Sequence, residues 1–574
     1  SIVVLENIYR YIEEGMEPFA ASIKGVREIG FAVVAMTLTL VAVFAPLAFT
    51  PGRTGRLFAE FALALAGSVM VSGVVALSLS PMMCSKLLKH NPKPSFFDKG
   101  MGQMLDALTR GYGYLLRWTL TGWRFGGFEF SRRWLVVGVM LLAAYGSYHL
   151  FINAKSELAP MEDRGVILVI INGPDGATLD YTQKYVNMLE KIGRKYSEFD
   201  KFFAVVGNPT VAQGAVFLGA LPWDERKRST LDMAREMMPA MGGMSGVMAF
   251  PITPPSLGQA FRERPFNFVV LTNDSYENLA KVTKTLQDEI AKNPGIVSLD
   301  VDLRLNKPEI SLEVDRERAA DLGIPVDVIA RAVETAMGGR SVTQYKREGE
   351  KYDVVVQTEA KNRNTPLDVE KIFVRGRADT MVPLSALVKM KEVVVPRELN
   401  HFGQRRSASI TSNLSADYSM GEALDFMDAT AKKVLKPGYS TDLNGTSREF
   451  VESSGSLALV FVLALLFIFL VLAAQFESFV DPFVILLSVP LSMVGALLAL
   501  KWSGGSLNVF SQIGLITLVG LITKHGILIV EFSNQMRGKG KSTMVAVKEA
   551  ATMRLRPILM TTGAMVLGAI PLAM

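Results

Sequence analysis

Long apolar stretches alternate with charged and polar segments along this 574-residue chain. Six of the stretches are close to the roughly 20 residues that an α-helix needs to cross a bilayer. They are Ile29–Phe49, Phe61–Met83, Trp134–Ile152, Ser456–Ala474, Val480–Leu500 and Val509–Glu531. Pro557–Met574 begins a seventh. The pattern predicts a polytopic α-helical membrane protein, with spans grouped as 29–83, 134–152, 456–531 and 557–574.

The polar insert between the third and fourth spans, residues 153–455, has the periodicity of a folded α+β region. Two of its parts repeat the order strand, helix, strand: Gly165–Asn172, Thr178–Tyr196 and Lys201–Gly207, then Phe266–Thr272, Ser275–Lys292 and Gly295–Leu303. This duplication predicts βαβ subdomains of ferredoxin-like type with mixed sheets. Residues at about 339–405 are predicted to form a separate docking subdomain, and Ser419–Leu435 a helix that returns to the first unit.

Lysine and arginine are concentrated in the segments 1–28, 84–133 and 532–556, whereas the opposite short loops carry only Arg53, Arg56 and Lys501. Because positively charged loops face the cytoplasm, these segments are predicted to be cytoplasmic, apart from the end of a membrane helix at the start of 1–28. The insert is then periplasmic in a Gram-negative host. Phe96–Phe128 mixes aromatic and basic residues, which predicts an amphipathic helix on the inner membrane surface. A packed loop helix is the alternative.

The composition fits such a mixed protein. Hydrophobic residues make up 49% of the chain and charged residues 20%, which is too apolar for an ordinary soluble protein and too charged for one confined to the bilayer. The net charge of +6 comes without a basic stripe, so no nucleic-acid partner is predicted. The one cysteine, Cys84, allows no disulfide within the chain, and four scattered histidines predict no metal site or cofactor.

One lysine interrupts the apolar pattern. Lys524 lies deep in the run Phe510–Val530, which carries no other lysine, arginine or carboxylate. A cation near the centre of a membrane helix costs roughly 2.5–3.5 kcal/mol on insertion scales. Such residues usually pair with a carboxylate and take part in ion or proton movement. The alternative is a lysine whose long side chain reaches the headgroups.

Several motifs resemble those of resistance–nodulation–division (RND) efflux pumps. Gly520–Phe532 is similar to the lysine-bearing helix of that family, and Arg554–Thr562 to the start of its next helix. Ala474–Pro482 resembles its short cytoplasmic turn, and Val3–Asn7 the segment that follows its paired aspartates. With the large insert, the resemblance covers the whole chain and is closest to the hydrophobe/amphiphile branch.

The resemblance implies a homotrimeric proton antiporter of the inner membrane. It would export hydrophobic or amphiphilic small molecules, together with a periplasmic adaptor and an outer-membrane channel, and would use no cofactor. The aspartates would lie before Ser1, so the chain is expected to be an internal piece of a longer protein.

The same resemblance implies a proton relay in which Lys524, Arg554 and Thr561 match family positions. Arg554 could instead be a positively charged anchor at the cytoplasmic surface, and Thr561 could bond only to its own helix. His525 departs from the family, which usually has a small polar residue there. It is expected to pack against a neighbouring helix, with a place in the relay as the alternative.

Substrate contacts are implied at Phe203 and Phe217, and Phe250 is placed at the periplasmic entrance. Large aromatic side chains bind varied apolar ligands through contact area. The alternative is that all three belong to the core of a sheet. The loop Asn208–Gly214 has no aromatic residue, unlike the phenylalanine-rich loop of the family, which predicts a different range of compounds.

Two other functions stay open. A methionine cluster could bind Cu(I) or Ag(I), as in a heavy-metal exporter, although methionine is also a common core filler; its members are Met233, Met237, Met238, Met241, Met244 and Met248. A membrane assembly or translocation protein is the second alternative, but it has no reason to bury Lys524. The sequence shows no nucleophile–base or phosphate-binding motif, so a secondary transporter is predicted and not an enzyme.

Overall fold

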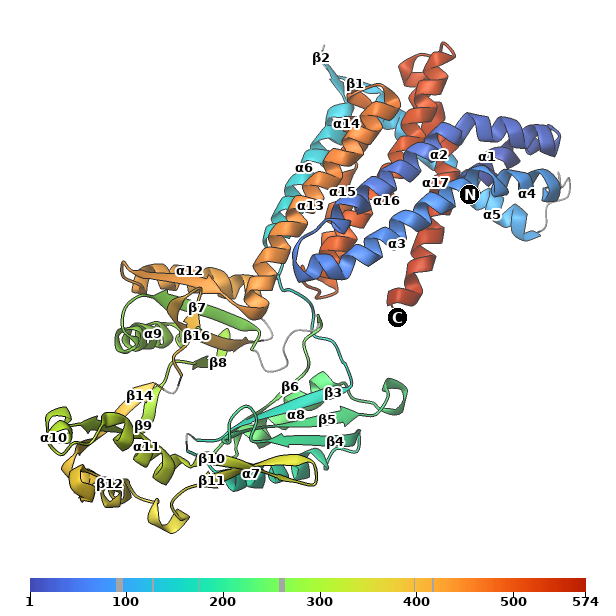
Figure 1. Ribbon diagram of the computed structural model, residues 1–574. Coiled ribbons are helices and arrows are strands. Elements are labelled where there is room, and N and C mark those ends of the chain that lie inside the picture. Colours follow the sequence, from blue (N-terminus) through green and yellow to red (C-terminus); the bar gives the residue numbers. More distant parts are fainter. Residues whose placement is uncertain are drawn as a thin grey trace.

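The computed structural model describes residues 1–88, 96–125, 128–174, 176–257, 264–396, 398–415 and 418–573. It consists of a bundle of long helices and a separate region of small sheets and shorter helices (Figure 1). Within these residues, six helices are long and apolar enough to cross a membrane. Each of them overlaps one of the six predicted spans.

The apolar helices are α2 (Pro18–Ala48), α3 with α4 (Gly52–Leu77 and Leu79–Leu87), α6 (Arg133–Ile152), α13 (Gly445–Phe476), α14 with α15 (Val480–Leu486 and Val489–Trp502) and α16 (Val509–Gly538). They are accompanied by α1 (Ile2–Glu13) and α17 (Thr543–Ala573). α2 contacts α1, α3, α13 and α16, and it is the most enclosed of the six. Two polar residues of α2, Ser22 and Thr39, are accordingly buried inside the protein.

Side-chain caps set where two of these helices begin. The Asn508 side chain accepts a hydrogen bond from the Ser511 backbone N–H at the start of α16, and Asn444 does the same for Gly445 at the start of α13. Such caps satisfy N–H groups that have no partner inside the helix. α13 ends at Phe476, and the next residue, Glu477, has a left-handed φ of 51° that stops the helix.

Part of the cytoplasmic segment predicted at 84–133 lies outside the described residues, namely 89–95, 126 and 127. The amphipathic helix predicted there corresponds to α5 (Phe96–Leu120), followed by the hairpin of β1 (Gly122–Phe125) and β2 (Phe128–Ser131). One side of α5 contacts α17. The other side exposes apolar side chains at helical spacing: Met101, Met104, Leu108 and Leu115. Its place on the membrane surface remains a prediction.

The first α/β unit is a four-stranded sheet with the order β4-β5-β3-β6. Its strands are β3 (Val166–Asn172), β4 (Phe199–Val206), β5 (Gln213–Ala220) and β6 (Met248–Ile252). The helices α7 (Leu179–Gly193) and α8 (Thr230–Gly242) cover one face. The core on that face is built around Val169, Val216 and Leu218.

The second unit repeats this arrangement. Its main strands are β7 (Phe266–Thr272), β8 (Ile296–Val301), β16 (Arg405–Leu414) and β17 (Tyr439–Leu443), and its helices are α9 (Tyr276–Ile290) and α12 (Met420–Val434). The order β8-β16-β7-β17, with short β15 (His401–Phe402) also on β16, matches the first unit strand for strand. The predicted duplication is therefore visible in the strand order.

Two details differ from the sequence predictions. The helix predicted at Ser419–Leu435, which is α12, contacts α9 of the second unit and does not return to the first. This is because β16 re-enters the second sheet after a long insertion, so the next helix belongs there. The sheets are also not mixed, since every strand pair in the described ranges is antiparallel. The strands that run parallel, such as β3 and β4, are separated by a third.

The insertion between β8 and β16 forms a unit of its own. It contains β9 (Leu305–Val314), α10 (Arg316–Asp321), α11 (Val326–Val333), β10 (Arg340–Arg347), β11 (Glu350–Val356), β12 (Phe373–Arg375), β13 (Met381–Pro383) and β14 (Val388–Pro396). Its core joins Ile324 and Ile329 to Val374 and Leu384. The docking subdomain predicted at about 339–405 is thus part of a larger unit that begins before residue 339.

Two connections tie the helix bundle to the second α/β unit. α13 follows β17 directly and runs into the bundle (Figure 1), and the Ser447 Oγ near its start accepts a hydrogen bond from the Asn267 backbone N–H at 2.9 Å. After α6, the Lys155 carbonyl accepts from the Leu507 N–H at 2.7 Å, in the loop between α15 and α16. The Ser156 carbonyl accepts from the Gly421 N–H of α12 at 3.4 Å.

Candidate functional site

Lys524 lies on the side of α16 that contacts α17. Its Nζ donates to Met565 Sδ at 3.1 Å. A thioether is a weak acceptor and carries no charge. Among the residues that the structure describes, no carboxylate lies within 4 Å of this nitrogen. The half-buried ammonium group therefore has no opposite charge here to offset its desolvation.

The neighbours of Lys524 on these two helices make weaker polar contacts. His525 Nε2 lies 3.5 Å from Thr562 Oγ1, so it packs against α17. Thr561, which is 9% exposed, donates to the Ile558 carbonyl at 3.0 Å, one turn away on its own helix. The structure does not bring Thr561 into hydrogen-bonding contact with Lys524.

Arg554, also on α17, is only 2% exposed. Its Nη1 donates to Asn7 Oδ1 at 3.4 Å, and its guanidinium carbon lies 4.2 Å from the centre of the Phe532 ring. Its Nε is buried without a partner in the described ranges. This enclosure does not fit a simple anchor at the membrane surface, because an anchor would be solvated.

Asn7 connects Arg554 to a carboxylate on α2. The Asn7 Nδ2 donates to Glu28 Oε2 at 3.0 Å and to the Gly25 carbonyl at 2.9 Å. The same Glu28 oxygen accepts from Arg10 Nη2 at 2.6 Å and from the Tyr11 hydroxyl at 3.1 Å. Charge-assisted hydrogen bonds of this kind are the strong ones. We refer to Asn7, Arg10, Tyr11, Glu28, Phe532 and Arg554 as the Arg554 cluster.

The Arg554 cluster and Lys524 occupy different levels of the bundle. Phe532, which covers Arg554, lies eight residues after Lys524 on α16. At 1.5 Å per residue this is about 12 Å along the helix. Lys524 and Arg554 are therefore two sites and not one ion cluster.

Sequence reasoning did not find Arg10 and Glu28, and it treated Asn7 only as part of a motif. A signal was nevertheless present. Glu28 directly precedes a predicted span, and Gly25 lies one turn before it. A Cβ at Gly25 would lie 2.9 Å from Ile8 of α1. Small residues that let two helices approach closely are typical of membrane interfaces.

Phe203 and Phe217 lie side by side on the first sheet. They are paired residues of β4 and β5, and their ring centres are 5.7 Å apart. Phe203 is 63% exposed, so it is not a core residue. The core of this unit is on the opposite face, around Val169 and Val216.

Phe250 lies on the same face as these two aromatic residues. It is paired with Ile170 on β3, and Phe217 is paired with Leu168 of the same strand. Because side chains alternate along a strand, residues two apart share a face. The three predicted substrate residues therefore lie along one side of a single sheet, the side turned away from α7 and α8. We call it the aromatic face.

The methionine cluster does not converge on a common point. Met233, Met237 and Met241 are 0% exposed and form part of the core between α8 and the sheet. Met238 and Met248 are 46% and 53% exposed. Spacing of four residues places the first three on one side of α8, where they fill the interior.

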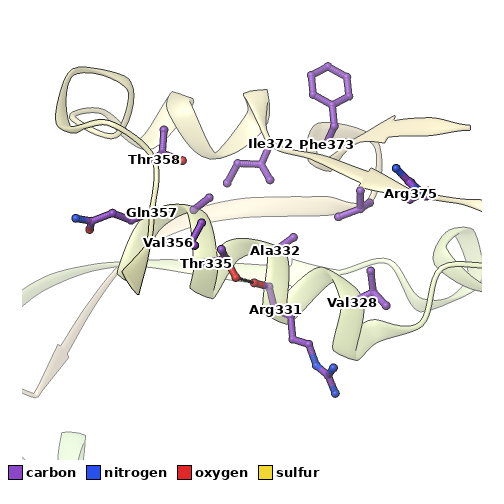
Figure 2. Close-up of a pocket in the computed structure, with 12 residues that line it drawn as sticks. Val328, Arg331, Ala332, Thr335, Val356, Gln357, Thr358, Ile372, Phe373 and Arg375 are labelled. Atoms are coloured by element: carbon purple, nitrogen blue, oxygen red, sulfur yellow. Dashed lines mark hydrogen bonds between the residues drawn. The ribbon is translucent and has the colours of Figure 1, made fainter. Parts of the chain in front are cut away.

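The insertion between β8 and β16 contains a cavity of about 520 Å³ between α11, the end of β11 and β12 (Figure 2). Arg331 and Arg375 line it, but they are paired with Asp327 and Asp379. The Thr335 hydroxyl donates to the Arg331 carbonyl at 2.7 Å. This cavity lies in a different unit from the aromatic face.

Long apolar helices, one of which carries a lysine without a carboxylate partner among the described residues, joined to duplicated α/β units, are typical of a polytopic membrane transporter. The family model described as the AcrB/AcrD/AcrF family matches residues 1–574. The chain therefore belongs to the AcrB/AcrD/AcrF family of RND transporters, which confirms the family that its motifs predict.

Named relatives give a finer comparison. An uncharacterized transporter of Haemophilus influenzae is 36% identical over 579 residues, which cover 100% of this chain and 55% of that protein. The multidrug resistance protein MdtC of Pectobacterium carotovorum is 30% identical over 580 residues, and that of Escherichia coli over 579, with the same coverage. The chain thus spans about half the length of the curated relatives that it matches.

Proposed function

We propose that the full-length protein is a proton-driven exporter of hydrophobic and amphiphilic compounds. The observation that carries this proposal is Lys524, a cation on an apolar helix whose ammonium group donates to the uncharged sulfur of Met565. A charge so placed marks an ion or proton path. The naming of MdtC relatives as multidrug resistance proteins supports export of drugs.

The proton carriers in this proposal are carboxylates that precede Ser1 in the longer protein. Asn7 of α1 contacts Arg554 and so lies at the same level of the bundle. Ser1 precedes Asn7 by six residues, which is about 9 Å along the axis of α1. Lys524 is about 12 Å from that level along α16. Residues just before Ser1 would thus reach the neighbourhood of Lys524, which needs a carboxylate.

Proton binding would then change helix contacts. When a carboxylate beside Lys524 is neutralised, its attraction for the ammonium group falls, and the helices can shift between two arrangements. Arg554 would hold the cytoplasmic end of the path, with Thr561 between the two levels on α17. α13 would pass the movement to the second α/β unit.

We interpret the two α/β units as ferredoxin-like subdomains on the periplasmic side of the inner membrane, since both share one strand order and two helices on one face. Compounds would bind at the aromatic face of the first unit. The assembly would be a homotrimer that works with a periplasmic adaptor and an outer-membrane channel, as the family resemblance implies. No feature of the methionines favours metal export, because half of them fill the core.

The test is accumulation of dyes and drugs in pump-deficient Gram-negative cells that carry the full-length protein and its adaptor. Lys524→Ala should raise accumulation to the level of cells without the pump. Lys539→Ala, at an exposed lysine just after α16, should leave efflux unchanged and serves as the matched control. Efflux by Lys524→Ala at wild-type level, with equal expression, would disprove the coupling role. Equal accumulation with and without the wild-type pump would disprove drug export.

A further inference from the structure

We infer that Arg264 contacts the exported ligand and favours amphiphiles whose polar group is a carboxylate or a sulfate. The inference rests on the proposed function and deepens it, because it assigns a charge preference to the aromatic face. Arg264 has no part in the family resemblance described above.

Arg264 lies where the two α/β units meet. It precedes β7 of the second unit by two residues, and its guanidinium carbon is 5.6 Å from the centre of the Phe250 ring of the first unit. Phe250 is on the edge strand β6 and therefore lies at one edge of the aromatic face. A ligand lying along that face would therefore have a cation at one end of its apolar contact surface.

Hydrogen bonds hold one nitrogen of this guanidinium in place. Nη1 donates to the Thr411 carbonyl at 3.4 Å and to the Ser298 carbonyl. Ser298 lies at a bulge of β8, where the pairing with β16 shifts register and the Ser298 φ is 56°. A bulge turns backbone groups away from their usual direction, and here it aims a carbonyl at Arg264.

The other edge of the guanidinium makes no hydrogen bond to the residues that the structure describes. Nη2 forms an ion pair with Asp300 Oδ2, but at 3.7 Å the separation is longer than a hydrogen bond. Nε donates to no residue within the described ranges, and neither atom is among the buried atoms that lack a partner. The side chain as a whole is 12% exposed, so it is not fully enclosed. This two-nitrogen edge is the part of arginine that binds a carboxylate or a sulfate through two parallel hydrogen bonds.

The local charge also favours an anion. Asp300, the carboxylate next to Arg264, already accepts from Arg304 Nη2 at 2.6 Å. Two guanidinium groups thus share one carboxylate, which leaves one excess positive charge among these three side chains. In a partly desolvated place, a cation without full compensation is costly, and a bound anion relieves that cost.

The aromatic face and the neighbouring Arg264 guanidinium together fit one class of ligand. The apolar body of an amphiphile would lie on the rings of Phe203, Phe217 and Phe250, and its anionic group would accept from Nε and Nη2 of Arg264. A cationic amphiphile would gain the same apolar contact but would meet an unfavourable charge at this end. Carboxylates and sulfates share the required geometry.

The test compares amphiphiles that share a twelve-carbon chain and differ in the polar group. Pump-deficient cells carrying the full-length pump and its adaptor are challenged with dodecyl sulfate, lauroylsarcosinate and dodecyltrimethylammonium. Arg264→Gln should lower tolerance of the anionic pair by about tenfold, the effect of losing charged hydrogen bonds. Tolerance of the cation should stay within about twofold. Arg264→Lys should keep part of the anion tolerance, because it keeps the charge and loses the two-nitrogen edge.

Arg406→Gln is the matched control. Arg406 belongs to the same unit and lies 5.5 Å from the ring of Tyr276, at the Thr272 end of β7, so its loss should not distinguish anions from cations. A loss for only one of the two anions would narrow the ligand to that chemistry and support the inference.

Equal losses for anions and cation in Arg264→Gln would show that Arg264 only joins the two units and would overturn the inference, as would no loss at all. Failure of the wild type to protect against any of the three compounds would overturn the proposed function, and the inference with it.

Discussion

The guanidinium carbon of Arg554 lies 4.2 Å from the centre of the Phe532 ring, which joins α17 to α16 through a cation–π contact. The arginine is almost fully buried, so the ring replaces part of the water that the cation has lost. Such contacts contribute about 2 kcal/mol or more when desolvated. Arg10 approaches the same ring, at 5.9 Å.

Replacing Phe532 should therefore impair the pump through Arg554. We expect Phe532→Leu to lower dye efflux several-fold at equal expression, because leucine fills similar space without attracting the cation. Phe532→Trp, which keeps an aromatic face, should retain more activity than Phe532→Leu. Efflux assays in whole cells measure both. If the leucine variant pumps like the wild type, the cation–π contact has no role in transport.

Glu28 is expected to stabilise the bundle, because one of its oxygens accepts from Asn7, Arg10 and Tyr11. Glu28→Gln leaves two mostly buried arginines without this charge. Breaking a buried pair costs up to 3–5 kcal/mol, and we expect about 2 kcal/mol here, since Arg10 is 20% exposed. Thermal unfolding of the purified full-length protein checks this. Glu17→Gln, at the exposed residue just before α2, should have little effect, and equal melting of both variants would refute the role of Glu28.

Asp163 should make the first α/β unit sensitive to acid. Burial opposes ionisation of its carboxyl group, but hydrogen bonds from Arg226, Thr230 and the backbone of Gly165 lower the pKa of Asp163 to about 2. A carboxyl group whose folded pKa lies below its unfolded value of 3.8 stabilises the fold fully above that value. The contribution, about 1–2 kcal/mol, is lost as the pH falls from about 4 towards 2.

The predicted acid sensitivity can be tested by amide hydrogen exchange of β3 and α8 in the full-length protein, measured at pH 5 and at pH 3. Protection should fall more between the two values in the wild type than in Asp163→Asn. The variant should already be less protected at pH 5, since Arg226, whose side chain is 2% exposed, loses its carboxylate. An equal decrease in both proteins would rule out Asp163 as the acid-sensitive group.

Two glycines of α16 should respond differently to the same substitution. A Cβ at Gly520 would lie 2.9 Å from Val43 and 3.1 Å from Leu40 of α2, whereas nothing lies within 4 Å of one at Gly514. Gly520→Leu should therefore destabilise the bundle by about 1–3 kcal/mol through overpacking. Gly514→Leu should be neutral or slightly favourable, because leucine is a better helix former than glycine. Melting temperatures of the two variants check this, and equal values would mean that α2 and α16 do not pack closely at Gly520.

The positions of the apolar helices could be predicted from the sequence because hydropathy reports the part of a helix that lies in lipid. It does not report where the helix ends. α2 begins at Pro18 and not near Ile29, and α16 continues to Gly538, because charged residues extend these helices without interrupting their backbone hydrogen bonds. The strands and helices of the α/β units were also predictable, since their periods differ.

The contacts that build the candidate sites could not be predicted in this way. Arg554 and Asn7 are 547 residues apart, and no local pattern pairs them. The aromatic face depends on strand register, because a shift of one residue would turn Phe217 into the core. The order of the second sheet depends on an insertion that separates β8 from β16, which also explains why α12 was assigned to the wrong unit.

The length of α13 has a mechanical consequence. Its 32 residues form one continuous helix of about 48 Å from the edge of the second sheet into the bundle. Such a rod acts as a lever, because a tilt of about 10° at its membrane end moves the other end by about 8 Å, given that length. The Ser447 hydrogen bond fastens the β7 backbone to that moving end. A small rearrangement deep in the bilayer would thus be enlarged before it reaches the sheet, without any hinge residue between them.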